Sequence, residues 1–423
     1  MGRMAATGVL SHVYPLGSRL NEAGRIEVGG CDLVELAREF GTPAYIVAED
    51  DIRARARAFS EAFRARHDSW EVLFASKAFP CTAVYRLLAE EGLACDVASG
   101  GELALALGGG FTAERIYLHG NAKSVDELRA ALDAGVGHIV IDSLDEVERL
   151  AAVLDGRSQR VLIRVTPGVR PSTHDFIATG QLDSKFGMPL DAARAAMARI
   201  AEIEGLDLVG VHMHIGSQIF ELEPYRRAID EIAALGTFEV YNLGGGLGVA
   251  YTAQDEPPSV EAYVEAKVSA AHAALGTDIR LLIEPGRSLV ANAGVTIYTV
   301  ETVKRGVSTY VAVDGGMSDN LRPMLYGAVY EAELADRPGA GGELCHVAGK
   351  HCESSDVIVR DVHLPDPRPG DVLVTPVTGA YGHAMANNYN GVPRPPVVFC
   401  RNGDARVVVR RETVEDLASR DVG

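Results

Sequence analysis

The sequence predicts an α/β protein made of a TIM-type (β/α)8 barrel plus a mostly antiparallel β domain. The first observation behind this is length, because 423 residues fit one large barrel with a smaller second domain. The second is a series of eight short apolar segments between Glu71 and Glu284, separated by amphipathic stretches. The third is that, after Asn292, the sequence changes to short β-like segments separated by turn-forming residues.

The eight apolar segments are the expected strands of the barrel. They are too apolar for a sheet with one face in water, so we expect a parallel sheet covered by helices. An open doubly wound sheet is the alternative, and eight βα units in about 210 residues favour the barrel. The expected strands are Val72–Ala75, Ala94–Ala98, Arg115–His119, His138–Asp142, Val161–Val165, Leu208–His214, Glu239–Leu243 and Leu281–Glu284. The expected helices include Ser124–Ala134, Asp191–Ile203 and Pro224–Leu235.

The remainder of the chain is expected to form the β domain. Residues 1–35 are short and β-like, and we expect them to join the carboxyl-terminal strands. The predicted division is therefore 1–35 and 290–423 for the β domain, and 36–289 for the barrel. The expected carboxyl-terminal strands are Thr296–Lys304, Thr309–Val313, Asp356–Val359, Val372–Thr375, Val397–Cys400 and Ala405–Val409.

Composition excludes several classes of function. The net charge of −18 argues against nucleic-acid binding, which needs a basic surface, although local arginines can still hold an anionic ligand. The six cysteines have neither CxxC pairs nor zinc spacing. Met1 to Val13 lacks the pattern of a signal peptide, and no segment approaches the roughly 18 apolar residues of a membrane helix. We expect a cytoplasmic protein with free thiols that binds neither membrane nor nucleic acid.

Chemistry-bearing residues follow the expected strands. Lys77, His214, Gly244–Gly246 and the segment Glu284–Arg287 each lie at, or just after, the end of one of them. Active groups of such barrels gather at the carboxyl ends of the strands. We therefore expect these side chains to meet in one site.

Their chemistry suits pyridoxal phosphate (PLP). Lys77 has apolar neighbours, which predict a desolvating pocket that would lower its pKa for Schiff-base chemistry; a surface lysine is the alternative. The backbone N–H groups of Gly244–Gly246 and the hydroxyl of Ser217 could bind a phosphate, although a tight turn alone explains three glycines. Arg287 offers a bidentate guanidinium. Glu284 could keep a pyridine nitrogen protonated, or form a salt bridge with Arg287.

Two further motifs have plainer explanations. His212 and His214 lie two apart on one strand face, but no further histidine or carboxylate is expected to complete a metal site, so we expect no metal. Cys352, in His351-Cys352-Glu353-Ser354, reads by itself as an ordinary thiol. Turn-forming glycine and proline explain the surroundings of Arg322, Tyr326 and Tyr381 without any function.

Taken in order, the motifs resemble the fold-type III PLP-dependent decarboxylases, and within them the diaminopimelate decarboxylases. The similarity runs from about Pro43 to Arg411. Besides the segments above, it includes Cys95–Glu102, His119–Lys123, Lys185–Gly187, Asp314–Tyr326, Gly379–Tyr381 and Asn388–Asn390. Ser355 departs from the family pattern, where glycine is frequent.

The resemblance implies an alanine-racemase-like barrel with a β domain, and a homodimer with shared active sites. The catalytic residues would be Lys77, which binds PLP covalently, His214, which stacks on its ring, and Cys352, the proton donor. Cys352 and Glu353 would come from the partner subunit. The other cofactor contacts would be Ser217, Gly244, Gly245, Gly246, Glu284, Pro285, Gly286, Arg287 and Tyr381. The substrate contacts would be Arg287, Arg322, Tyr326, Glu353 and Tyr381.

The implied reaction is PLP-dependent decarboxylation of meso-2,6-diaminopimelate to L-lysine and CO2, the last step of lysine biosynthesis. Arg322 and Tyr326 suit the distal carboxylate of that substrate, and Glu353 suits its ammonium. The first alternative is a related decarboxylase of another amino acid, including one tethered to a carrier protein. The others are an amino-acid racemase, which would need a tyrosine base opposite Lys77, and a non-catalytic relative, which would be expected to lose Lys77 or Cys352.

Overall fold

The computed structural model describes residues 10–169, 184–339 and 341–422. Two compact units divide the chain: one contains residues 1–52, 249–255 and 290–423, and the other contains residues 53–248 and 256–289. We call them the β unit and the barrel unit. The first boundary falls inside α2 (Glu49–Arg64), later than the predicted 35/36, because β4 (Ala44–Ala48) pairs with β13 and β19 of the β unit.

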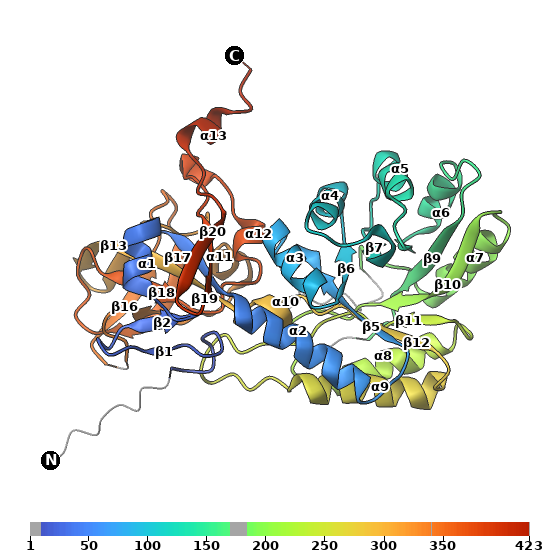
Figure 1. Ribbon diagram of the computed structural model, residues 1–423, viewed down its shortest axis with the longest axis horizontal. Coiled ribbons are helices and arrows are strands. Elements are labelled where there is room, and N and C mark those ends of the chain that lie inside the picture. The colour runs from blue at the N-terminus through green and yellow to red at the C-terminus, as the bar shows by residue number, and fades with distance from the viewer. Residues whose placement is uncertain (1–9, 170–183, 340, 423) are drawn as a thin grey trace. The chain divides into compact units, whose positions relative to one another are not determined.

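The barrel unit is a closed barrel of eight parallel strands (Figure 1). The strands pair in chain order and β12 closes on β5, which confirms the predicted fold class. They are β5 (Trp70–Ala75), β6 (Ala94–Val97), β7 (Ile116–Leu118), β8 (His138–Ile141), β9 (Gln159–Val165), β10 (Leu206–Met213), β11 (Val240–Asn242) and β12 (Arg280–Ile283). Each overlaps one predicted strand, because strands buried on both faces leave continuous apolar runs in the sequence.

Helices alternate with these strands, and several begin at a serine. The side chains of Ser99, Ser124, Ser143 and Ser259 accept a hydrogen bond from the N–H three residues later, which satisfies a donor that the first helical turn leaves unpaired. The helices are α3 (Thr82–Glu90), α4 (Gly100–Gly108), α5 (Val125–Ala134), α6 (Leu144–Ala151), α7 (Leu190–Ala201), α8 (Glu223–Ala233) and α9 (Val260–Leu275).

The core of the barrel is layered. One buried cluster takes a single residue from each strand: Leu73, Ala94, Tyr117, Val140, Leu162, Val209, Val240 and Leu282. Side chains two residues apart on a strand share a face. On six strands the buried position two residues beyond this cluster, toward the carboxyl end, is polar: Asp96, His119, Asp142, Arg164, Asn242 and Glu284; on β5 it is Ala75. On β10 the polar residue is His212, three beyond Val209, because the register shifts between Leu208 and Gly210. The sequence therefore builds an apolar plug beneath a polar layer.

His138 is buried in this barrel without a polar partner. Its side chain is 4% exposed, its ring stacks on Tyr117 at a centroid distance of 4.4 Å, and neither ring nitrogen has a partner within the described residues. Burial lowers the pKa of His138 to about 3, with the charges of Arg160 and Arg280 adding to the effect.

We expect this histidine to make stability fall in acid. The unfolded chain binds a proton near pH 6.5 and the folded chain does not, so stability is full above pH 6.5 and declines as pH falls toward the folded pKa. The free energy of unfolding should drop by up to about 2 kcal/mol between about pH 7 and about pH 5 from this residue. Denaturant titrations of His138→Phe should show a shallower pH dependence. The exposed His363, changed to Phe, is the control, and an unchanged slope for His138→Phe would contradict the prediction.

The β unit contains a three-stranded sheet, β1 (Arg19–Leu20), β2 (Ile26–Val28) and β3 (Cys31–Asp32), and a nine-stranded sheet. Six of the eight strand pairs of the larger sheet are antiparallel; β14 with β16 and β4 with β19 are parallel. Its strands are β4, β13 (Gly294–Arg305), β14 (Thr309–Val313), β15 (Glu333–Leu334), β16 (Glu343–Ala348), β17 (Val357–Leu364), β18 (Val372–Thr375), β19 (Val397–Arg401) and β20 (Asp404–Val409). The prediction missed β4, β15 and β16.

Short helices complete this unit: α1 (Leu33–Phe40), α11 (Arg322–Tyr326), α12 (Gly382–Met385) and α13 (Val414–Ala418). The last boundary between the units lies within α10 (Arg287–Val290). Within the described parts of the chain, no helix combines the length and the apolar character that a membrane span requires.

Candidate active site

Lys77 lies in a short 3-10 turn, Ser76–Ala78, directly after β5. Its neighbours Ala75, Ser76 and Ala78 are buried, while the lysine side chain itself is exposed. The apolar neighbours therefore pack into the barrel, and the desolvating pocket around the amine stays a prediction. Gly286 fits against this turn because a Cβ there would lie 3.0 Å from the Cβ of Ala75.

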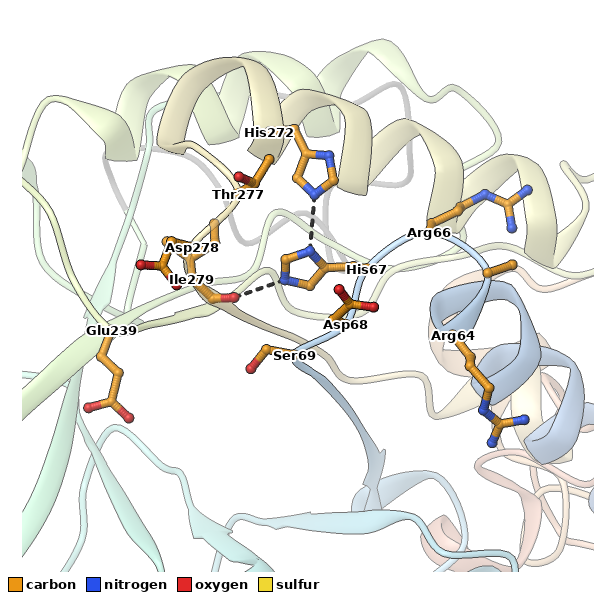
Figure 2. A pocket seen from close by; sticks show the side chains of 11 residues that line it. Arg64, Arg66, His67, Asp68, Ser69, Glu239, His272, Thr277, Asp278 and Ile279 are labelled. Carbon is orange, nitrogen blue, oxygen red and sulfur yellow. Dashed lines mark hydrogen bonds between the residues drawn. The ribbon is translucent and has the colours of Figure 1, made fainter.

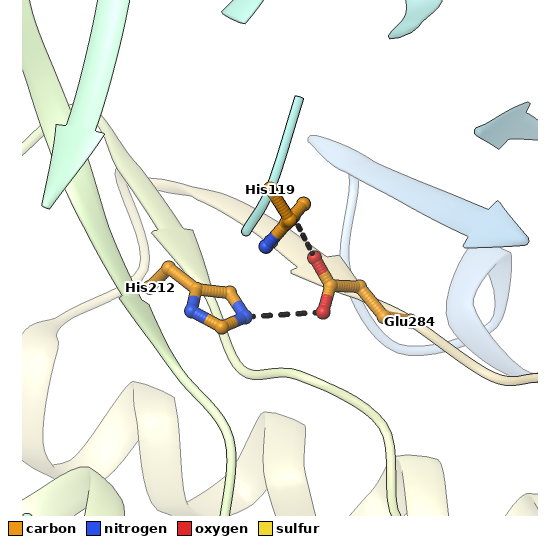
Figure 3. A group of neighbouring side chains, drawn as sticks. All are labelled: His119, His212 and Glu284. Carbon is orange, nitrogen blue, oxygen red and sulfur yellow. Dashed lines mark hydrogen bonds and ion pairs between the residues drawn. The ribbon is translucent and has the colours of Figure 1, made fainter. Parts of the chain in front are cut away.

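Glu284 follows β12 in the polar layer and is surrounded by nitrogen atoms (Figure 3). The amide of Asn242 donates to Oε1 over 2.6 Å, and His119 Nε2 lies 2.9 Å from the same oxygen. His212 Nε2 lies 3.0 Å from Oε2. We call these four residues the Glu284 cluster.

The cluster holds Glu284 as an anion. Burial alone would raise its pKa, but the charge of His119 and the hydrogen bonds from both imidazoles hold the pKa well below its usual range. Burial lowers the pKa of His212 to about 4, whereas Glu284 and Asp96 raise the pKa of His119 against the effect of burial. The charged pair is therefore Glu284 with His119. Because an ionised carboxylate has about four acceptor sites, one site on Oε2 is left for a further N–H donor.

His214 follows β10 and presents a neutral ring. The N–H of Gly245 donates to its Nδ1 over 3.2 Å, which fixes that nitrogen as an acceptor. Burial lowers the pKa of His214 well below the usual range, and the nearby charges of Lys77 and Arg164 lower it further. A neutral, oriented imidazole suits stacking against another flat ring.

The glycine turn after β11 differs from its prediction. The N–H of Gly244 donates to Oδ1 of Asn242, and that of Gly245 donates to His214, so two of the three proposed phosphate donors already have acceptors. Only the N–H of Gly246 lacks an acceptor within the described residues. The reason is that the turn is also the link between the Glu284 cluster and His214. Beside it, Arg287 donates to Oγ of Ser217 over 3.0 Å.

In the β unit, Arg322 is 6% exposed at the start of α11. Its guanidinium lies 4.6 Å from the ring centroid of Tyr251 and 5.6 Å from that of Tyr330, and it donates to the hydroxyl of Tyr330. No carboxylate among the described residues forms an ion pair with it. A buried guanidinium without an anion is costly, so Arg322 is suited to bind an anionic ligand. Tyr326 lies half-buried on the same helix.

Cys352 lies on a loop of the β unit that a buried carboxylate organises. Asp356 accepts hydrogen bonds from the N–H of Met317 and of His351, and from Nδ1 of His351 over 2.7 Å. Cys352 is exposed, and its N–H donates to Oδ1 of Asn390. The loop therefore presents an accessible thiol on a fixed backbone.

Glu353 and Tyr381 complete the predicted β-unit residues. Glu353 is exposed and accepts a hydrogen bond from the N–H of Ser355. Tyr381 adopts a left-handed conformation, with φ of 63°, just before α12.

A polar hollow lies at the amino-terminal end of the barrel strands, the end away from the candidate site (Figure 2). His272 and His67 share a hydrogen bond of 3.0 Å there, and His67 Nε2 also contacts the carbonyl of Ile279. Active groups of such barrels belong at the carboxyl ends, so this hollow is not the candidate site.

The chain is similar to known PLP enzymes. Residues 49–291 match the family model described as pyridoxal-dependent decarboxylase, pyridoxal binding domain. A diaminopimelate decarboxylase of Actinosynnema pretiosum subsp. auranticum is 50% identical, over 97% of this chain and 95% of the relative. The chain belongs to the diaminopimelate decarboxylase family. The Bacillus subtilis (strain 168) member of the family is 47% identical, over 96% of this chain and 97% of the relative.

A solved structure in the diaminopimelate decarboxylase family is also similar. The enzyme from M. jannaschii in co-complex with L-lysine matches with a TM-score of 0.90 and 34% identity, over 96% of this chain and 98% of that chain. The resemblance expected from the sequence is thereby confirmed, as is the class of PLP-dependent carboxy-lyase.

The barrel-unit residues fit the PLP of the diaminopimelate decarboxylase family. The Glu284 cluster leaves one carboxylate acceptor site for a protonated ring nitrogen, and His214 presents a neutral flat face. The N–H of Gly246 has no acceptor within the described residues and lies in the same turn as His214's donor, Gly245. Ser217 and Arg287 add a hydroxyl and a cation, which suit a phosphate.

Sequence reasoning missed several members of the site. His119 and Asn242 had no predicted role, although each lies two residues beyond an apolar core position of its strand, and that spacing was the available signal. The expectation that no histidine or carboxylate would join His212 was wrong, because His119 and Glu284 come within 4.8 Å of it from other strands. His214 is not part of that group. Tyr251 and Tyr330, which hold Arg322, leave no signal in the sequence.

Proposed function

We propose that this protein decarboxylates meso-2,6-diaminopimelate to L-lysine and CO2 with PLP, as the last step of lysine biosynthesis. The observation that carries the proposal is the Glu284 cluster, a buried carboxylate held ionised at the carboxyl ends of the barrel strands with one acceptor site remaining. Membership of the diaminopimelate decarboxylase family supports the same reaction.

Each barrel-unit residue has a distinct task in this proposal. When bound, PLP accepts the electron pair that the substrate carbon keeps as CO2 leaves. Glu284 would hold the proton on the ring nitrogen, and His214 would stack on the ring. Lys77 supplies the amine that binds PLP covalently. Ser217, Gly246 and Arg287 would orient the phosphate, with Gly244, Gly245, Pro285 and Gly286 shaping the two turns.

The β unit supplies the proposed substrate contacts. Arg322 would bind the distal carboxylate with Tyr326 nearby, and Glu353 would bind the distal ammonium. Tyr381 would contact phosphate and substrate, and Arg287 the substrate also. Cys352 would donate a proton to the carbon that has lost its carboxylate; it and Glu353 would act from the partner subunit of a homodimer. A cytoplasmic location is part of the proposal, supported by cysteines without disulfide or zinc spacing.

The first test is CO2 release from the PLP-loaded protein offered meso-diaminopimelate, L-lysine, L-ornithine and L-arginine in parallel. We expect release from diaminopimelate alone, with L-lysine as the product. Release from another substrate would keep the decarboxylation and contradict the proposed role of Arg322. No release from any of the four, with PLP bound at Lys77, would indicate a carrier-tethered substrate or a protein without catalysis.

A further inference from the structure

Lys267 on α9 is fully buried and points at the glycine turn. Its side chain is 0% exposed. Its Nζ donates to the carbonyl oxygens of Leu243, Gly244 and Gly245 over 2.7, 2.9 and 3.4 Å. No carboxylate of the described residues lies within ion-pair distance of it. Burying a cation without a paired anion costs free energy. Because Lys267 has no such anion, we look for its role in the carbonyl groups that it contacts.

The surroundings of Lys267 suit an ammonium ion. An ammonium has three N–H donors and no acceptor, and here it faces three carbonyl oxygens. The rings of Tyr225 and Tyr263 each lie with their centroids 4.5 Å from Nζ, which favours a cation. Burial lowers the pKa of Lys267, while the charge of Glu284 acts in the opposite direction. A neutral amine would turn a lone pair toward a carbonyl oxygen.

Fixing these carbonyl groups also fixes the N–H groups of the turn. In a planar trans peptide the C=O and the N–H point in opposite directions. The carbonyls of Leu243, Gly244 and Gly245 point toward α9, so the N–H groups of Gly244, Gly245 and Gly246 point away from it.

Each of those three N–H groups belongs to a different part of the candidate site. The N–H of Gly244 donates to the side chain of Asn242, whose amide in turn donates to Glu284. The N–H of Gly245 holds His214. The N–H of Gly246 lacks an acceptor within the described residues. Tyr263 assists from behind, because its hydroxyl donates to the carbonyl of Gly245 over 3.0 Å.

We propose that Lys267 is a positioning residue that sets the glycine turn for the cofactor, aligning Glu284, His214 and the phosphate donor of Gly246 from behind. In this proposal Lys267 acts through the carbonyl groups of the turn and is assigned no contact with cofactor or substrate. This inference rests on the proposed function, in which the turn faces the phosphate of PLP. If Lys267 served only the stability of the fold, its loss would not change recognition of the phosphate group; the proposed role requires that it does.

The test compares binding of PLP with binding of pyridoxal, which has the same ring without the phosphate, to the full chain stripped of cofactor. For Lys267→Met, the preference for PLP over pyridoxal should fall at least tenfold. Val264→Ala removes buried volume from the same helix without removing a hydrogen-bond donor to the turn, and is the matched control. It should lower the melting temperature and leave the preference unchanged.

Tyr263→Phe keeps the ring and removes one donor to the turn, so the inference can be tested even if Lys267→Met fails to fold. Its preference for PLP should fall at least threefold. An unchanged preference in both variants, or in Tyr263→Phe if it alone folds, would overturn the role of Lys267. A wild-type protein without any preference for PLP would instead overturn the phosphate site of the proposed function.

Discussion

Replacing Lys77 with alanine is expected to abolish covalent attachment of PLP, and with it the visible absorption band of the bound cofactor. Turnover should fall by a factor on the order of 10³ or more, since the nucleophilic amine is lost. The other barrel-unit lysines with buried amines cannot substitute. Lys123 is paired with Glu146 at 2.7 Å, and Lys267 donates to three carbonyls. The measurements are the absorption spectrum and CO2 release.

Lys185→Ala is the matched control, because Lys185 is also exposed on the barrel unit. It should keep the absorption band. Borohydride reduction of the wild-type protein, followed by peptide mapping, should place the modified residue at Lys77. A band that survives in Lys77→Ala would refute the assignment.

Arg322→Met should impair recognition of the distal carboxylate. Methionine can still pack between Tyr251 and Tyr330, so the change removes mainly charge. Losing a buried charge-assisted contact costs about 2–4 kcal/mol, or roughly 30- to 1000-fold. We expect a loss of that size in kcat/KM for diaminopimelate. Binding of L-lysine, which has a carboxylate, should weaken at least tenfold, whereas binding of 1,5-diaminopentane, which has none, should change less than threefold.

The control for Arg322 is Arg337→Met, in the same unit, because Arg337 is already paired with Asp371. It should leave the binding of both L-lysine and 1,5-diaminopentane unchanged. If Arg322→Met weakened L-lysine and 1,5-diaminopentane equally, Arg322 would be a structural residue and the distal carboxylate would bind elsewhere.

The barrel could be predicted from sequence because its signals are local. Each of its strands is an apolar run, and helices such as α5 show both an amphipathic face and a serine cap. The missed strands have no such context. β4 is an apolar pentapeptide near the start of the barrel region, and only its pairing with β13 and β19, far along the chain, identifies it as part of the β unit. Pairing between distant segments leaves no periodic signal.

The residues of the candidate site also fall into two groups, those that a local sequence motif identifies and those that only distant contacts identify. Lys77, His214, Glu284 and Arg287 are recognisable because each follows a strand within a distinctive short motif. His119, Asn242 and Lys267 act through hydrogen bonds between different strands or helices, so their partners are not neighbours in sequence. For the same reason the sequence predicts that Gly244 and Gly245 donate to a phosphate, whereas their N–H groups donate to Asn242 and His214.

The placement of β4 has a consequence for how the chain is made. During translation β4 leaves the ribosome before every strand of the barrel, yet its neighbours β13 and β19 are synthesised only after the last barrel strand, β12. The barrel unit can therefore fold around its own core before the strands that pair with β4 have been synthesised. Of the two units, the β unit is the one whose folding cannot finish until β19, which follows every barrel strand in the chain, has been synthesised.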